Sequence, residues 1–271
     1  MERSNPIGFF DSGIGGLTVV KEAMSLLPNE NIVYFGDTAR VPYGPKSNST
    51  VIEYTLQAAR FLMKKNIKML VIACNTASSV ALDELRKRVE IPVIGVIEPG
   101  VKMALETTRT GRIGVIGTMA TINNKAYSSQ LKNLDRKVKV FEKACPLFVP
   151  LAEEGWLDHK ATKLIAKEYL AELKEDDIDT LILGCTHYPI LAKVIGHAIG
   201  KNVKLVNSGE PTSYIIKSYL EGRGIRSQSV QLGKHEFYVS DVPAKFKNIA
   251  ERFLGKKVDN LQKIDLEELL K

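Results

Sequence analysis

Short apolar runs alternate with amphipathic stretches along nearly the whole of this 271-residue chain. The runs are typical of buried β-strands, and the stretches between them repeat apolar residues at the three- and four-residue spacing of helices. Buried strands separated by helices indicate a largely parallel sheet covered on both faces. We predict strands at 7–11, 31–36, 69–74, 93–97, 112–117, 137–142, 180–185, 203–206 and 237–240. We predict helices at 17–27, 51–64, 121–131, 160–173 and 212–220.

The chain also divides into two similar halves. Each half has an early strand ending in a glycine or aspartate turn, and a later strand ending in a cysteine followed by small polar residues. We therefore predict an α/β fold of two similar domains, each a mostly parallel sheet flanked by helices, with the active site in the cleft between them. We predict that the chain passes from one domain to the other at 92–100 and again at 206–211. The first domain is then discontinuous and contains 1–97 and 208–271, and the second contains 98–207.

The two cysteine segments carry the strongest indication of chemistry. Cys74 follows the apolar run Val71-Ile72-Ala73, and Cys185 follows Leu181-Ile182-Leu183-Gly184. The carboxyl ends of parallel strands are where α/β sheets usually bind ligands. Two similar thiols in similar settings indicate one site with a sulfur on each side, suited to a reaction that needs an acid on one face of a carbon and a base on the other. A helix start after Cys74 predicts a lowered pKa for its thiol.

Each cysteine also has a simpler interpretation as a small buried apolar residue. For Cys185, the histidine two positions on can polarise the thiol or complete a Cys-x-His metal pair. Zinc would need two further ligands, and no Cys-x-x-Cys or His-x-x-x-His pattern accompanies the pair. Cys145 has no polar cluster after it, so we predict a structural role for it. Three cysteines do not form a disulfide framework, which favours a reducing compartment.

Other turns follow predicted strands. The segment Asp11-Ser12-Gly13-Ile14-Gly15-Gly16 matches neither the dinucleotide fingerprint nor the Walker pattern, so we predict a tight turn that exposes Asp11 and Ser12, with helix capping as the alternative for Asp11. Two ordered loops, at 34–44 and 114–121, are candidates to line a pocket. Glu153 is open between a surface charge and a site carboxylate. Surface positions are expected for His159, His197 and His235.

Composition narrows the class of protein. No apolar stretch approaches the length of a membrane span, and the N-terminus does not read as a secretory signal, so we expect a cytoplasmic protein. The net charge of +7 fits a nucleic-acid partner only weakly, because the lysines are spread over predicted helix faces. A positive field would also help to attract an acidic small molecule.

Taken together, these motifs resemble those of the bacterial glutamate racemases, of the aspartate/glutamate racemase superfamily. The resemblance rests on the segment 11–16, Tyr43-Gly44, Cys74-Asn75-Thr76, the segment 184–189 and Val206-Asn207-Ser208-Gly209-Glu210, in that order, and covers nearly the whole chain. It implies two α/β domains, a site between them, no cofactor and a homodimer. The implied reaction converts L-glutamate to D-glutamate for peptidoglycan.

The resemblance also implies roles for single residues. Cys74 would take the α-proton from D-glutamate, assisted by Asp11, and Cys185 would take it from L-glutamate, assisted by His187 and Glu153. Substrate carboxylates and ammonium would be held by Asp11, Ser12, Tyr43, Gly44, Asn75, Thr76, Thr118, Thr121, Thr186 and His187. This agrees with the chemistry, since an α-hydrogen is a very weak acid whose removal needs an oriented base in a water-poor site.

Three alternatives remain open from the sequence. The first is another two-cysteine racemase or isomerase, acting on aspartate, a hydantoin or a dicarboxylate. The second is a protein that uses the cleft only for binding, or a partner of nucleic acid or topoisomerase. The third is a pyridoxal phosphate racemase, which would need a Schiff-base lysine that none of the turn motifs carries.

Overall fold

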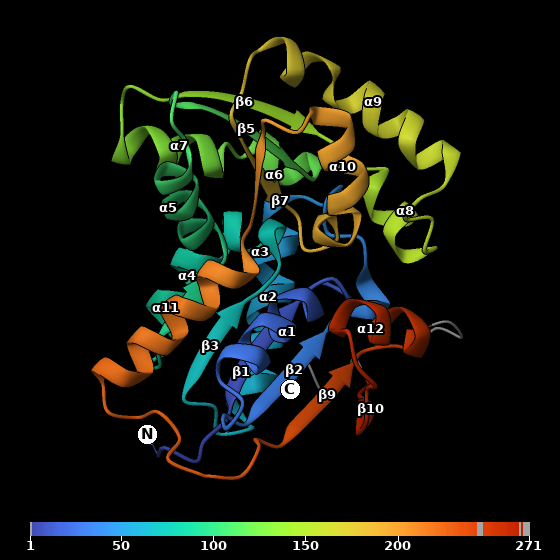
Figure 1. The fold of residues 1–271 in the computed structure, drawn as a ribbon. Helices are drawn as coiled ribbons and strands as arrows, with labels where there is room; N and C mark the ends of the chain where they lie inside the picture. Colours follow the sequence, from blue (N-terminus) through green and yellow to red (C-terminus); the bar gives the residue numbers. More distant parts are fainter. Residues whose placement is uncertain (1, 243–245, 266, 268–271) are drawn as a thin grey trace.

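The computed structural model describes residues 2–242, 246–265 and 267, and the described chain forms two parallel sheets (Figure 1). The larger sheet has six strands in the order β10-β9-β2-β1-β3-β4 and the smaller has four in the order β6-β5-β7-β8. The larger sheet contains β1 (Ile7–Asp11), β2 (Ile32–Gly36), β3 (Met69–Ile72), β4 (Val93–Gly95), β9 (His235–Val239) and β10 (Leu261–Lys263). The smaller contains β5 (Arg112–Gly117), β6 (Lys139–Ala144), β7 (Thr180–Gly184) and β8 (Lys204–Asn207).

Helices cover both faces of each sheet, because successive strand side chains point to opposite faces. Phe10 of β1 packs with the α2 side of the larger sheet, whereas its neighbour Phe9 packs with the α1 side. The elements that belong with the larger sheet are α1 (Leu17–Leu26), η1 (Thr38–Arg40), α2 (Asn48–Met63), α3 (Asn75–Val80), α4 (Leu82–Arg88), α11 (Gly209–Gly222) and α12 (Phe246–Leu254). Those of the smaller are α5 (Ile97–Thr107), α6 (Met119–Asn123), α7 (Ala126–Leu134), α8 (Phe148–Glu153), α9 (Lys160–Glu175), η2 (Tyr188–Leu191) and α10 (Ala192–Ile199).

One apolar cluster runs through both sheet units. It joins Ile14 and Leu17, next to the larger sheet, to Leu183, Cys185 and Tyr188 of the smaller. A second link is α11, which packs against both α1 and α5. The two sheet units therefore share apolar contacts, and the packing of this shared core fixes their relative placement. None of the described helices is long and apolar enough to cross a membrane.

The predicted α/β class with two parallel sheets is confirmed, while several element bounds differ from those predicted. The helix predicted at 121–131 is two helices, since α6 ends at Asn123 and Lys125 takes a left-handed backbone with φ 51° before α7 starts. The strands predicted at 69–74 and 180–185 end before their cysteines. The short edge strand β10 was not predicted. Only its first residue is partly buried, so its sequence lacks the apolar run of a buried strand.

The division of the chain into domains at 97/98 and 207/208 stays a prediction. The strands of the larger sheet come from residues up to Gly95 and from His235 onward, and those of the smaller come from Arg112 to Asn207. The segment after β8 thus returns to the larger sheet through α11, β9, α12 and β10 (Figure 1).

A buried ion pair joins distant segments at the amino-terminal edge of the larger sheet. Lys68 Nζ lies 2.6 Å from Glu30 Oε2, and both side chains are almost completely buried. The same ammonium donates to the carbonyl oxygens of Arg3 (2.7 Å) and Ile225 (2.9 Å), and Glu30 Oε1 accepts from the backbone N–H of Ser227. The pair thus ties the N-terminal segment to the segment that follows α11.

Replacing Lys68 by Met leaves the Glu30 carboxylate buried without its partner. We expect the free energy of unfolding to fall by about 3–5 kcal/mol, and the melting temperature to fall by roughly 6–15 °C. The double variant Lys68→Met/Glu30→Leu removes both charges and should recover most of the loss. Thermal unfolding of the three proteins measures this, and equal melting temperatures for the wild type and Lys68→Met would contradict it.

Candidate active site

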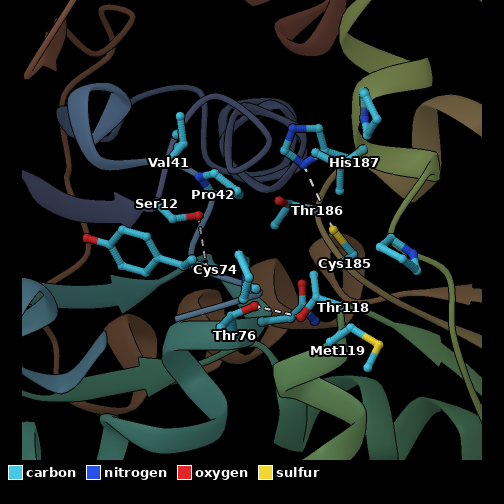
Figure 2. A pocket seen from close by; sticks show the side chains of 18 of the residues that line it. Ser12, Val41, Pro42, Cys74, Thr76, Thr118, Met119, Cys185, Thr186 and His187 are labelled. Carbon is cyan, nitrogen blue, oxygen red and sulfur yellow. Dashed lines mark hydrogen bonds between the residues drawn. The ribbon is translucent and has the colours of Figure 1, made fainter. Parts of the chain in front are cut away.

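A pocket of about 420 Å³ opens where the carboxyl ends of strands from both sheets face each other. Figure 2 shows Cys74 and Cys185 on opposite sides of this pocket, one from each sheet unit. It is lined by Ser12, Gly13, Val41, Pro42, Tyr43, Gly44, Pro45, Cys74, Asn75, Thr76, Thr118, Met119, Pro146, Val149, Pro150, Glu153, Cys185, Thr186 and His187. Of the predicted site residues, Asp11 and Thr121 are absent from this lining because both are completely buried behind it.

Cys74 lies between the end of β3 and the start of α3, where it serves as the N-cap residue. Its Sγ accepts from the N–H of Ala77 (3.4 Å) and donates to Ser12 Oγ (3.4 Å). Burial, and next the negative charge of Asp11, raise the pKa of the thiol to about 12. The lowered pKa predicted from the helix start is therefore wrong, since those hydrogen bonds are outweighed by desolvation.

Asp11 ends β1 and lies behind the pocket. Its Oδ2 accepts from the N–H of Gly13 (2.9 Å). Burial raises the pKa of this carboxyl, while His187 and the backbone hydrogen bonds from Gly13 and Gly16 oppose the rise. Asp11 interacts electrostatically with Cys74, and the side chain that touches the Cys74 sulfur is Ser12.

Cys185 lies in a chain of three polar side chains. His187 Nδ1 is 3.9 Å from Cys185 Sγ, and His187 Nε2 is 2.8 Å from Glu153 Oε1 at the last residue of α8. Burial alone lowers the pKa of His187, but the hydrogen bonds and charges of Cys185 and Glu153 outweigh it and raise the pKa to about 10. The imidazole is therefore protonated at neutral pH.

The glycine-rich turn after β1 brings the two units together. A Cβ atom at Gly15 would collide with Thr186 Oγ1 and His187 Nδ1, so only glycine allows this approach. The hydroxyl of Thr18 completes the contact, because its single proton is shared between the carbonyl of Thr186 (3.0 Å) and that of Gly15 (2.9 Å). The sequence pattern predicted the turn itself. Its contact with the Thr186-His187 segment depends on tertiary packing.

Hydroxyl groups from both units meet at the opposite end of the pocket. Thr76 Oγ1 lies 2.9 Å from Thr118 Oγ1 (Figure 2), and Thr118 Oγ1 lies 3.0 Å from Thr121 Oγ1. Asn75 Nδ2 donates to the hydroxyl of Tyr127 (2.7 Å), a residue that sequence reasoning missed. Two helices, α3 and α6, start at this cluster, and the first N–H groups of a helix have no partner within the helix.

Tyr43 lines the pocket, but its hydroxyl is engaged elsewhere. It donates to Asp37 Oδ2 (2.5 Å), and burial together with the charge of Asp37 raises the pKa of the phenol. Asp37 also pairs with Arg40 (2.7 Å) and accepts from Ser240 (2.8 Å). Asp37 therefore holds the 38–44 loop in place, a role that the sequence did not reveal.

Apolar residues form much of the rest of the wall. Val41, Pro42 and Met119 lie in the two loops that were predicted as candidates to line a pocket, whereas the apolar residues at 45 and 146–150 were not predicted. The apolar residues of the wall come from loops and from the first turns of α6 and α8, and four of them are prolines: Val41, Pro42, Pro45, Met119, Pro146, Val149 and Pro150. No lysine or arginine is among the described residues that line the pocket. An anionic ligand here would thus be held by N–H and O–H donors, of which the His187 imidazole is the charged one. Within the described residues, no group of three His, Cys, Asp or Glu side chains is placed to hold a metal ion.

The remaining cysteine and histidines lie outside the pocket. Cys145 is buried, its thiol donates to the carbonyl of Lys143, and its own carbonyl accepts from Tyr188. His159 is exposed and accepts from the N–H of Ala161 at the start of α9, and His197 is also exposed. His235 is half-buried, and burial lowers its pKa, so the surface position predicted for it is only partly correct.

Comparison with known proteins agrees with this geometry. The Asp/Glu/Hydantoin racemase family model matches residues 18–210. A glutamate racemase from Geobacter metallireducens is 52% identical, over 96% of this chain and 97% of that protein.

Solved structures extend the comparison. Glutamate racemase RacE1 from Bacillus anthracis superposes with a TM-score of 0.94 at 40% identity, covering 98% of this chain and 99% of that one. The Francisella tularensis enzyme, in complex with D-glutamate, superposes at 0.92 with 41% identity, covering 98% and 99%. The chain therefore belongs to the Asp/Glu/hydantoin racemase family and, within it, to the glutamate racemases.

Proposed function

We propose that this protein interconverts L- and D-glutamate by a cofactor-independent mechanism in which Cys74 and Cys185 act on opposite faces of the α-carbon. The observation that carries the proposal is the placement of two thiols on opposite sides of one pocket (Figure 2). The family membership supports glutamate as substrate, and the structure of the Francisella tularensis relative is a complex with D-glutamate.

The proton balance follows from the unlike surroundings of the two sulfurs. In the L-to-D direction, Cys185 takes the α-proton as thiolate and Cys74 delivers its own proton to the other face. A pKa of about 12 keeps Cys74 in the thiol form that this delivery needs. Protonated His187 stabilises negative charge on Cys185, and Glu153 holds the proton on His187. In the D-to-L direction the two thiols exchange roles. Cys74, assisted by Ser12 and Asp11, takes the α-proton as thiolate, and Cys185 delivers its own proton to the other face.

Neutral donors hold the substrate in this mechanism. We propose that its carboxylates bind the N–H and O–H groups of Ser12, Gly44, Asn75, Thr76, Thr118 and Thr186, with Thr121 and Tyr43 supporting these groups. We place the ammonium on the side of Asp11 and Glu153, where two carboxylates outnumber the one imidazolium of His187. Fixed dipoles of this kind orient the substrate and stabilise charge as it develops at the α-carbon.

The cellular role follows from the family resemblance. We propose that D-glutamate is supplied for peptidoglycan, in the cytoplasm, by a homodimer. Sedimentation equilibrium of the purified protein tests the dimer, and a monomer at micromolar concentration would contradict it. We propose no nucleic-acid role, because the lysines are spread along the chain and do not form one block.

Replacing either pocket thiol by a hydroxyl should abolish racemisation. Because a serine hydroxyl is a far weaker base than a thiolate, we expect Cys74→Ser and Cys185→Ser each to lower the rate by roughly 10³-fold or more. Circular dichroism of glutamate measures the rate. The matched control is Cys145→Ser, in which a buried cysteine outside the pocket changes in the same way and activity stays within about tenfold.

Turnover in heavy water provides a direct test of proton transfer. Because the reprotonating thiol exchanges its hydrogen with solvent, we expect the racemised product to carry deuterium at Cα. Proton NMR of the recovered glutamate measures this. Racemised product without deuterium would falsify the two-thiol mechanism.

The substrate alternatives separate in an assay panel. We expect racemisation of glutamate and at most roughly 1% of that rate with aspartate or a hydantoin, because a shorter or cyclic substrate leaves the hydroxyl cluster at Thr76 and Thr118 without a partner. Circular dichroism over the panel measures the rates. Activity on aspartate with none on glutamate would assign the chain to the aspartate alternative.

Glu153→Gln should move the alkaline limb of the pH–rate profile. His187 loses its proton as pH rises through about 10. We expect the rate to fall as this proton is lost. The variant removes a charge that raises this pKa, so we expect the limb to move to lower pH by about 0.5–1 unit. The profile of kcat between pH 7 and 11 measures the limb. The substrate ammonium titrates equally in both proteins, so a difference between their limbs comes from the protein.

The control for this variant is Glu172→Gln. Glu172 also pairs with a cation at 2.8 Å, namely Lys143, but lies on the surface of α9 away from the pocket. Its limb should coincide with that of the wild type. A limb that is unmoved in Glu153→Gln would show that Glu153 does not act on His187.

A further inference from the structure

Helix α12 reaches from the larger sheet unit to the smaller. It comes from the C-terminal segment that returns to the larger sheet, and it packs on α1. Figure 1 shows it next to α8, which belongs to the smaller sheet unit. Two neighbouring residues of α12 make the contact. Arg252 Nη1 donates to the carbonyls of Ala152 (3.4 Å) and Glu153 (3.2 Å), and the Phe253 ring meets the His187 ring edge-on at 5.2 Å.

The guanidinium is fitted to the end of α8. A Cβ atom at Gly155 would lie 2.6 Å from Arg252 Nη1 and 2.7 Å from Cζ, so the group rests directly on this glycine. Gly155 has φ +74°, the left-handed conformation that commonly ends a helix, and its N–H donates to Ala152. The last carbonyls of a helix are short of donors and carry partial negative charge. Arg252 supplies both a donor and a positive charge there.

The helix end that Arg252 holds is the one that carries Glu153. The Glu153 side chain is 39% exposed, yet its carboxylate lies 2.8 Å from His187 Nε2. An exposed glutamate loses rotamer entropy when it is held in one geometry. Fixing its backbone from a second helix reduces the freedom that remains. Phe253 limits the position of the imidazole from the other side.

We propose that Arg252 is a positioning residue for the acid–base group formed by Cys185, His187 and Glu153. It holds the last turn of α8 so that the Glu153 carboxylate stays on His187. The inference rests on the proposed function for its effect on catalysis, and on the geometry alone for its effect on His187. It also makes the C-terminal segment part of the site, although no residue of α12 lines the pocket.

Two effects of Arg252 on His187 have opposite signs, which allows them to be separated. The groups that face His187 are Cys185, Glu153 from α8, Asp11 from the end of β1 and the uncharged Phe253 from α12. As a nearby positive charge, Arg252 opposes protonation of His187. As the residue that places Glu153, it favours protonation. Loss of positioning therefore moves the alkaline limb to lower pH, and loss of charge alone moves it to higher pH.

The test is Arg252→Gln, followed by rates and by proton NMR of the histidine rings. We expect the alkaline limb of kcat and the titration of His187 to move to lower pH by about 0.5 unit. We expect kcat at pH 8 to fall roughly 3–10-fold with KM changed less than about twofold. The chain has four histidines, so the His187 resonance is assignable by comparison with His187→Asn.

Two further variants complete the experiment. Arg252→Lys keeps a cation that can donate to one carbonyl. It should move the alkaline limb part of the way back to its wild-type position and recover part of kcat. It also replaces Arg252→Gln in the test if the glutamine variant folds poorly. Lys247→Gln removes an exposed cation from the same helix and should match the wild type. A His187 titration that is unmoved or moves to higher pH in Arg252→Gln overturns the inference. Absence of glutamate racemisation in the wild type would instead overturn the proposed function, and the NMR titration would still test Arg252.

Discussion

The close contact between the Gly15 turn and the Thr186-His187 segment is the constraint on which the rest of the site depends. Each sheet places one cysteine at the carboxyl end of a strand, but a pocket with two thiols exists only if the two edges face each other. The absence of a side chain at Gly15 permits that approach, and the Thr18 hydroxyl joins the two backbones there. The apolar cluster that runs through both units then holds the arrangement.

The two thiols occupy related positions but different surroundings. Cys74 is buried next to Ser12 with Asp11 behind it, which favours the neutral thiol. Cys185 lies beside a protonated imidazole that a carboxylate supports. A symmetric pair of strands therefore carries an asymmetric acid–base pair. Such an unequal pair suits a substrate in which only the configuration at the α-carbon is inverted.

Much of the fold was predictable from periodicity, because buried parallel strands and amphipathic helices have distinct spacings. The strands at 7–11 and 112–117 were predicted at their observed bounds. Prediction failed where local signals were weak. The break at Lys125 depends on a left-handed backbone, and β10 is an exposed edge strand. Most predicted site residues line the pocket, since polar residues after a strand meet at one sheet edge. Thr121 and Asp11 lie behind it because each is completely buried.

The sequence by itself determined the class of fold, the two cysteine segments and the polar residues that follow them, because these depend on local patterns of burial and on turns. Only the tertiary structure decided which groups act on one another. The pKa of Cys74 is raised because burial outweighs the helix start, and Tyr43 turns its hydroxyl to Asp37. Arg252 reaches the end of α8 from the far end of the chain. Such contacts join residues distant in sequence, and their distances and desolvation arise only when the two units pack together.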